Sequence, residues 1–370
     1  MPDLSYSYQN IKRDLSDAIS LVSQAEPTLI SLVTVGGEPA RATKHEWLED
    51  VLEPEGDTLS AAVDASATSL SVADGTKFVE GMVLAFEGYD EIMKVTAVSG
   101  NTLTVVRGYG GTTPEAMAAG TEIKIVSRPR PEATDPGDDR TREPGVEWNQ
   151  TEIFDYTVKV SKTAQAIKIY GIDNLINYQV NNALKILSRR MNNALIYGRR
   201  VQRAANEPGS MGGILQFVGQ AGGNVFDAAG ASLTSELLND AIEEIVRKGG
   251  RPNVLLANTV QARKISAFNV ANLQIERSDT TAGNVVYRFV NDLPMGIITT
   301  IVVDINFPKG KLAILDTSRI RVCPLEGRGM SDEDATPPGA DYIGRRVLGE
   351  YTAEIKNAKE AHGLITNLAV

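Results

Sequence analysis

The sequence has little of the side-chain chemistry on which metal sites and many enzymes depend. Its 370 residues include one cysteine and only two histidines. A single cysteine excludes an intrachain disulfide framework and fits a reducing compartment. A metal site built on histidine and cysteine would have too few ligands. The histidines, His45 and His362, lie in different parts of the chain, and we interpret both as polar packing residues.

An excess of basic residues and long apolar runs are also missing. The formal net charge is −10. This argues against tight sequence-independent DNA binding, which needs lysine and arginine to displace phosphate counterions, and it favours solubility. No apolar run approaches the length that spans a bilayer, and the polar, acidic first residues do not make a secretory signal. We therefore expect no contact with a membrane.

Motifs for catalysis and cofactor binding are absent from the sequence. No Gly-x-Ser-x-Gly segment occurs, and the glycine-rich stretches 107–116 and 208–214 lack the lysine and hydroxyl residue that end a phosphate loop. We interpret both stretches as turns. The acidic run Asp332, Glu333 and Asp334 lacks the spacing of a calcium loop and indicates a solvated loop. The sequence thus predicts that the protein is not an enzyme and has no catalytic, cofactor or metal site.

A long helix is the main feature that the sequence does contain. Residues 173–205 hold no proline, and apolar residues recur at steps of three and four. This spacing predicts an amphipathic helix with one apolar stripe. The stripe consists of Ile176, Val180, Leu184, Leu187, Met191 and Leu195. Asp173 is a candidate N-cap, and at ~1.5 Å per residue the helix would be about 50 Å long. We call it the spine helix; Asn192 and other polar residues are expected on its exposed surface.

Residues 60–128 have a different texture. Charged residues become rarer, and short β-rich runs alternate with turn residues, among them the hairpin signal Ser99-Gly100-Asn101. About five short strands predict a small β-barrel or sandwich. Polar, proline-containing segments flank it, and the one that follows, 128–145, indicates an exposed linker. The β-rich region therefore has the character of a domain inserted into a larger fold.

The remaining sequence combines long strands with an α/β region. Residues 146–167 are a long strand candidate, with Phe154, Tyr156 and Val158 alternating with polar residues before the spine helix. Residues 215–330 alternate between helix and strand, with a clear helix near 232–249. Near the end, Tyr351, Ala353 and other alternating residues indicate a further long strand, which could pair with the strand before the spine helix.

This order of elements resembles the Hong Kong 97 fold, an α+β fold. Local segments are also similar to one family of major capsid proteins of tailed bacteriophages and prophages, in which a β domain is inserted in the extended loop. The segments are HEWLEDVL (45–52), NTLTVVRGYGGTTPEAMAAGT (101–121), MNNALIYGRR (191–200), SMGGILQFV (210–218) and GEYTAEIKNAKEAHGLITNL (349–368). None of them is a catalytic signature, so the resemblance depends on their combination.

The resemblance implies a division of the chain into four parts. These are an N-terminal arm (1–45), an extended loop (46–146) carrying the β domain (about 60–128), a peripheral domain (147–210 and 335–370) with the spine helix, and an axial domain (211–334). The arm and loop would be buried on neighbouring subunits. Head-to-tail contacts that close into rings supply such a geometry.

The function implied is that of a structural shell protein. It would assemble with itself into pentamers and hexamers and form the icosahedral shell that encloses phage dsDNA, without sequence-specific binding. Its location would be the virion capsid, made and assembled in the host bacterial cytoplasm. Scaffold, portal and decoration proteins would be further partners. No lysine–asparagine pair for covalent crosslinking can be identified.

Three other functions are alternatives to this one. An encapsulin-like nanocompartment shell would have the same fold and a groove for a cargo peptide. A surface protein could bind a glycan through the β domain, although a secretion signal is missing. A cytosolic hydrolase would need a nucleophile and base, and the sequence offers no such set.

Overall fold

The computed structural model describes residues 29–36, 38–50, 55–130, 132, 143–167, 174–268, 273–277, 285–290 and 298–370. The chain divides into two compact units, Met1–Glu49 with Gly145–Val370 and Asp50–Pro144. We call them the larger unit and the inserted unit. Most of the N-terminal arm expected at 1–45 and most of the linker expected at 128–145 lie outside the described residues. None of the described helices is long and apolar enough to span a membrane.

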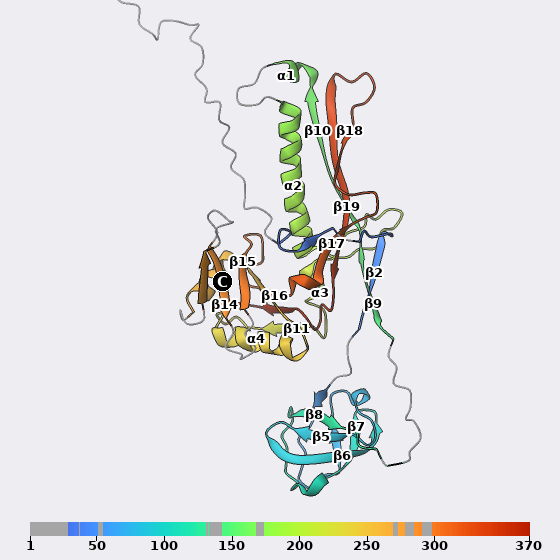
Figure 1. Ribbon diagram of the computed structural model, residues 1–370, viewed down its shortest axis with the longest axis vertical. Helices are drawn as coiled ribbons and strands as arrows, with labels where there is room; N and C mark the ends of the chain where they lie inside the picture. The colour runs from blue at the N-terminus through green and yellow to red at the C-terminus, as the bar shows by residue number, and fades with distance from the viewer. Residues whose placement is uncertain are drawn as a thin grey trace, which may run out of the picture. The chain divides into compact units, whose positions relative to one another are not determined.

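An elongated sheet forms one part of the larger unit (Figure 1). Its strands are β1 (Thr34–Val35), β17 (Ile320–Pro324), β19 (Tyr342–Ile355) and β10 (Glu152–Ser161) in spatial order, with β18 (Ser331–Asp334) also paired to β19. β10 and β19 are antiparallel, from Glu152 opposite Tyr351 to Ser161 opposite Tyr342. The predicted pairing of the last long strand with the strand before the spine helix is therefore confirmed.

Helices and a two-stranded ribbon adjoin this sheet. They are α1 (Lys162–Ala166), the spine helix α2 (Leu175–Tyr197), β2 (Lys44–Glu49) and β9 (Gly145–Gln150). The long strand predicted at 146–167 is in fact β9, β10 and α1. It ends at Ser161, whose side chain accepts a hydrogen bond from the Ala164 amide and so caps α1. β2 and β9 pair antiparallel and carry the chain to and from the inserted unit.

A seven-stranded sheet forms the other part of the larger unit. Its strands, in spatial order, are β11 (Asn224–Asp227), β20 (Gly363–Thr366), β16 (Leu312–Leu315), β12 (Val254–Ala257), β15 (Ile298–Val303), β14 (Val285–Val290) and β13 (Leu273–Arg277). The helices are α3 (Ile214–Phe217), α4 (Ser235–Arg247) and α5 (Thr259–Ser266). On α4, Thr234 is the N-cap, the apolar face is buried, and Gly249 after its end has φ +87°. The predicted α/β character of this region is thus present.

Each of the two sheets contains strands from both the predicted peripheral domain and the predicted axial domain. β17 and β18 come from the segment expected in the axial domain, 211–334, yet both pair with β19. β20 comes from the segment expected in the peripheral domain, yet it pairs with β11 and β16. The acidic run Asp332 to Asp334 is accordingly part of a strand, where a solvated loop was predicted. Pairing between distant segments cannot be read from local sequence pattern.

The inserted unit contains a six-stranded sheet. Its strands, in spatial order, are β3 (Gly56–Thr58), β8 (Glu122–Ser127), β5 (Val83–Phe86), β6 (Tyr89–Ser99), β7 (Thr102–Val106) and β4 (Ser69–Ser71). The predicted hairpin at residues 99–101 joins β6 to β7, and Gly100 has φ +56°. Its separate apolar core surrounds a buried ion pair, in which Glu91 accepts hydrogen bonds from Arg107 at 2.6 and 2.7 Å.

Candidate functional site

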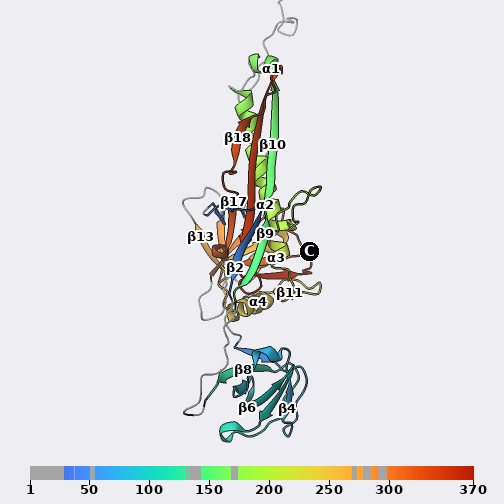
Figure 2. The ribbon, with the colours of Figure 1, turned by 90° about the vertical axis from the view of Figure 1, so that its right-hand side faces the viewer.

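The candidate site predicted from the sequence is the apolar stripe of the spine helix. Ile176, Val180, Leu187, Met191 and Leu195 are buried. They belong to the main apolar core of the larger unit, together with side chains of the elongated sheet. Figures 1 and 2 show α2 lying along β10 and β19, against which it packs. A part in shell assembly for this stripe stays a prediction.

Leu184, the sixth predicted stripe residue, differs from the others. Its exposed fraction is 37%. Leu184 lies three residues before Leu187, which at 3.6 residues per turn is about 60° away around the helix axis. In the middle of the helix, the face that the sheet covers is narrower than the apolar stripe predicted from the sequence. Leu184 lies at the margin of this covered face.

The spine helix is shorter than predicted. Asp173 lies outside the described residues, and Asn174 is the N-cap, with its side chain accepting from the Asn177 amide. The helix ends at Tyr197 rather than at residue 205 because Gly198 leaves the helical conformation, with ψ 146°. A Cβ atom at Gly198 would lie 2.2 Å from the Met211 carbonyl oxygen. The close approach of another backbone segment therefore ends the helix here.

The approaching segment is SMGGILQFV, in which a turn was predicted. A Cβ atom on Gly213 would lie 2.6 Å from the Ala194 carbonyl oxygen and 2.7 Å from that of Leu195. Only glycine allows this contact between the backbone and the end of α2. α3 begins at Ile214 and buries Phe217 against the spine. The paired glycines before an apolar run were the signal, but the sequence does not say what they approach.

Asn192 is a functional candidate that the sequence analysis placed on the exposed surface. This prediction is wrong, since Asn192 is buried. Its Oδ1 accepts hydrogen bonds from the Leu29 and Ile30 amides, both at 3.2 Å, and its Nδ2 donates to Asp304 Oδ2 at 2.8 Å. Asn192 thus links the spine to the chain following residue 28 and to the loop after β15. No sequence signal marks it, because an asparagine on this side of a helix usually faces water.

Buried polar groups hold the ribbon of β2 and β9 to the rest of the larger unit. Asn149 on β9 donates from Nδ2 to the carbonyl oxygens of Ala353 at 2.7 Å and Gly212 at 3.0 Å. Its Oδ1 accepts from the Gly212 amide at 2.8 Å. One side chain therefore connects the ribbon, the last long strand and the glycine segment. We call this region, where β2 and β9 contact the rest of the larger unit, the base of the insertion.

Glu350 is a buried carboxylate beside the base. It accepts a hydrogen bond from Arg203 at 2.9 Å and from the Thr151 hydroxyl at 2.7 Å, and it pairs with Arg328 at 3.0 Å. Removing a charge from water is costly unless partners and hydrogen bonds compensate. Glu350 has both, so its charge fixes Arg203 and Arg328 in place. Arg203 was predicted to belong to the helix and instead lies in the chain after it.

Glu354, which lies further along β19 on the same face as Glu350, is the second buried carboxylate. It contacts His45 Nε2 at 2.6 Å, Arg321 Nη2 at 2.9 Å and Lys356 Nζ at 3.3 Å. Burial alone would raise the pKa of Glu354, but the hydrogen bonds from His45 and Arg321 outweigh it and lower this pKa to about 2. Cys323 is adjacent, and burial raises the pKa of its thiol to about 11.

His45, Cys323 and Glu354 form the one group among the described residues whose donor atoms could hold a metal ion. His45 was predicted to be a packing residue, and a count of histidines and cysteines alone leaves out the Glu354 carboxylate. More than 250 positions separate His45 from the other two, so only the fold brings them together.

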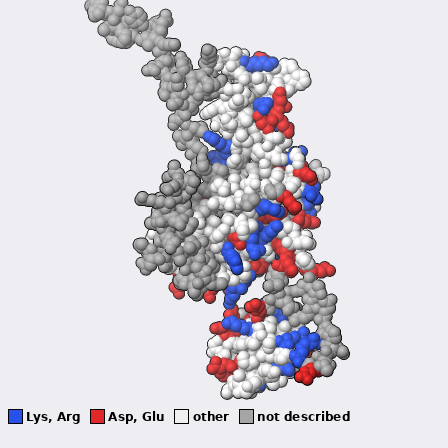
Figure 3. Space-filling model, viewed as in Figure 1, with Lys and Arg blue, Asp and Glu red and all other residues white. Residues whose placement is uncertain are grey.

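Charged side chains of both signs lie on the face of the chain that is visible in Figure 3. Figure 3 shows acidic and basic side chains interleaved over the visible face, with no extended field of one sign. Several pairs join neighbouring strands, such as Arg346 with Asp155 at 2.9 Å and Arg345 with Asp332. Exposed pairs of this kind contribute little stability.

Comparison with protein families gives a match over nearly the whole chain. The family model described as the SU10 major capsid protein matches residues 3–369. A curated relative, "Major capsid protein" of Pseudomonas phage PaMx41, is 27% identical over 140 residues, which are 38% of this chain and 34% of that protein. The chain thus aligns with about a third of the length of this relative.

Solved structures share the fold at low sequence identity. The capsid of Cyanophage A-1(L) has a TM-score of 0.56 and 11% identity, covering 97% of this chain and 98% of its own. The SrpI encapsulin of Synechococcus elongatus PCC 7942 has a TM-score of 0.52 and 11% identity, covering 97% and 96%. At such identity the likeness concerns the fold alone.

Proposed function

The chain belongs to the SU10 major capsid protein family, and we propose that it self-assembles into pentamers and hexamers that close an icosahedral shell around phage dsDNA. It has the Hong Kong 97 fold and is a structural capsid protein of a bacteriophage virion. The observation that carries the proposal is the family match over residues 3–369. The fold alone would not suffice, because an encapsulin shares it.

We further propose roles for the four parts of the chain that were predicted from the sequence. In our proposal the arm (1–45) and the extended loop (46–146) lie over neighbouring subunits. The peripheral domain (147–210 and 335–370) contains the spine helix, and the axial domain (211–334) meets its copies around five- and six-fold axes. The exchange of β17, β18 and β20 between the sheets ties these two domains together.

An exposed apolar pair on the ribbon supports contact with a neighbour. Leu48 on β2 lies opposite Val146 on β9, and their exposed fractions are 69% and 61%. Apolar side chains this exposed gain about 25 cal/mol per Å² when a partner covers them. We propose that a neighbouring subunit covers this pair. Many moderate contacts per subunit would sum to a stable shell.

The charge of the chain agrees with a container for DNA. A net charge of −10 gives the chain little affinity for phosphate, so the shell would enclose packaged DNA without binding it tightly. We also propose that it binds no specific DNA sequence. We propose assembly in the host bacterial cytoplasm, with scaffold, portal and decoration proteins as further partners. The inserted unit is the candidate contact for a decoration protein.

Electron microscopy of the expressed chain tests the proposal. The chain would be imaged in negative stain alone and after co-expression with its neighbouring genes. We expect closed shells of uniform diameter with clusters at five- and six-fold positions. Small monodisperse particles under both conditions would overturn the proposal, and shells that load protein cargo in place of DNA would establish the nanocompartment alternative.

A further inference from the structure

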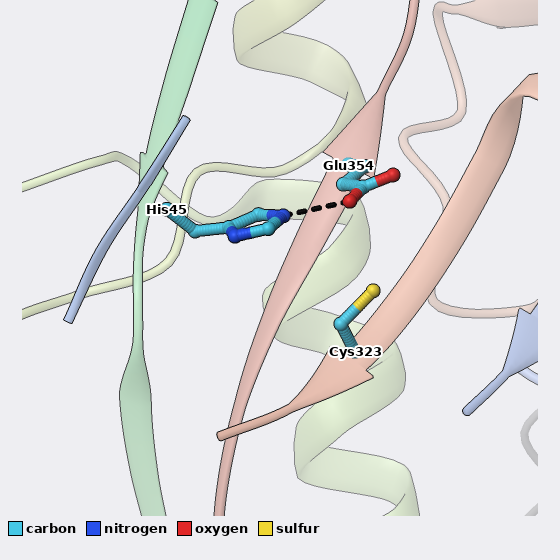
Figure 4. A group of neighbouring side chains, drawn as sticks. All are labelled: His45, Cys323 and Glu354. Carbon is cyan, nitrogen blue, oxygen red and sulfur yellow. Dashed lines mark hydrogen bonds and ion pairs between the residues drawn. The ribbon is translucent and has the colours of Figure 1, made fainter. Parts of the chain in front are cut away.

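Three potential metal ligands converge at the base of the insertion. His45 comes from β2, Cys323 from β17 and Glu354 from β19, and their donor atoms all lie within 4.8 Å of one another. Figure 4 shows His45 reaching across to the Glu354 carboxylate while the Cys323 sulfur lies beside it. Cys323 and Glu354 are buried, whereas the side chain of His45 retains 17% exposure. An ion could therefore enter from the His45 side.

The three donors are of the types that zinc selects. Imidazole nitrogen, thiolate sulfur and carboxylate oxygen are its usual protein ligands, and sites with three of them complete the tetrahedron with water. The thiolate disfavours magnesium and calcium, which prefer oxygen ligands. We propose that His45 Nε2, Cys323 Sγ and a Glu354 carboxylate oxygen bind one Zn²⁺ ion, with a water molecule as the fourth ligand.

Zinc binding would replace existing hydrogen bonds of the three side chains with bonds to the ion. The hydrogen bond between His45 Nε2 and Glu354 Oε1, 2.6 Å long, would be replaced by a bond from each residue to zinc. The Cys323 thiol would release its proton to solvent, since the thiolate is the ligand. Glu354 would keep Arg321 on its other oxygen, where Arg321 Nε lies at 3.1 Å and Nη2 at 2.9 Å, and would give up the contact of Nη2 with Oε1 at 2.9 Å.

The neighbouring cations set the strength that we expect. Arg321 and Lys356 already share the Glu354 carboxylate, and Lys356 Nζ lies 3.3 Å from Oε2. Their positive charge opposes a divalent ion, so binding should be weaker than at a structural site with four ligands. Removing the charge of Lys356 should then tighten binding. A cluster that serves only as an ion-pair network would bind no metal ion with or without Lys356.

A bound ion would connect three strands at one point. β2 leads to the inserted unit, whereas β17 and β19 belong to the elongated sheet. Zinc would fix the ribbon against this sheet more firmly than the single hydrogen bond from His45 does. The inference does not depend on shell formation, because metal binding can be measured on the chain whether it is assembled or not.

Cobalt titration of the full 370-residue chain tests the proposal. Co²⁺ substitutes for Zn²⁺ and gives a thiolate-to-metal charge-transfer band, which Zn²⁺ then abolishes by competition. We expect a stoichiometry of one ion per chain for wild type. Cys323→Ser should lose the band, and His45→Gln should weaken binding at least tenfold. Circular dichroism would establish that both variants fold.

Two further variants serve as controls. Glu46→Gln removes a carboxylate from the same strand but from its opposite face, and it should bind Co²⁺ like wild type. Lys356→Gln should bind Co²⁺ several-fold more tightly. The proposal would be overturned if wild type shows no charge-transfer band at millimolar Co²⁺. It would equally be overturned if Cys323→Ser binds as wild type does, or if Lys356→Gln binds more weakly.

Discussion

Replacing Leu187 tests the buried face of the spine helix. Leu187 has no exposed surface and lies in the main core of the larger unit. Truncating a buried leucine to alanine removes its burial and leaves a cavity, which costs about 2–5 kcal/mol. Leu187→Asp adds the cost of a carboxylate without a partner in the core. Typical domains have only about 5–15 kcal/mol of stability in total, so we expect Leu187→Asp to abolish both folding and assembly.

Leu184 supplies a matched control, because it is the same residue type one turn away. Its exposed fraction is 37%, so a truncated side chain there leaves a space that water can fill. We expect Leu184→Ala to cost about 1 kcal/mol and Leu184→Asp to leave the chain folded. The four variants therefore separate damage to the core from damage to a surface.

Denaturant unfolding and negative-stain microscopy provide the two measurements. Unfolding gives the free-energy change for the alanine variants, and microscopy shows whether the aspartate variants form particles. Normal particles from Leu187→Asp would refute burial of this face. Equal losses of stability in Leu187→Ala and Leu184→Ala would refute the view that the sheet covers only part of the predicted stripe.

Three further predictions follow from buried polar groups. Burial lowers the pKa of His362 to about 4 from a usual 6.5, so below pH 6.5 the unfolded chain binds a proton that the folded chain refuses. Stability should fall by about 3 kcal/mol between pH 6.5 and 4, at 1.36 kcal/mol per pKa unit, and His362→Asn should remove this part of the pH dependence of thermal unfolding. Arg107→Met leaves the buried charge of Glu91 without its ion-pair partner and should lower the stability of the inserted unit by about 3–5 kcal/mol. Hydrogen exchange of the inserted unit measures this loss, and adding Glu91→Gln should restore part of the lost stability. Asn192→Ala leaves two backbone amides without their acceptor and should cost about 1–3 kcal/mol, with the fastest exchange at those two amides; unchanged exchange there would contradict the contact.

The elements that the sequence predicted well are those specified by nearby residues. A helix was predicted near 232–249, and α4 lies within that range, with Thr234 as its cap and Gly249 after it in the left-handed conformation. The hairpin at Gly100 also has the predicted position. The order of the elements and the scattered segments were sufficient to indicate the Hong Kong 97 fold and a major capsid protein, which the family match confirms.

The candidate site was less predictable because its residues act at a distance. Leu184 fits the helical spacing of the stripe, but its exposure depends on how wide a surface the sheet offers. Asn192 fits the polar side of the helix, yet it accepts hydrogen bonds from Leu29 and Ile30. The spacing of residues in the sequence indicates on which face of a helix or strand a side chain lies. It does not indicate which other segment of the chain packs against that face.

The sequence by itself determined the local elements and the family, since periodicity, caps and turn residues act within a few positions of each other. The tertiary structure alone decided which polar groups are buried and which residues pair with them. Glu350 and Glu354 look like exposed positions on an alternating strand, but the fold surrounds them with Arg203, His45 and Arg321. A buried charge is stable only beside its partners, and those partners come from segments that meet only after folding.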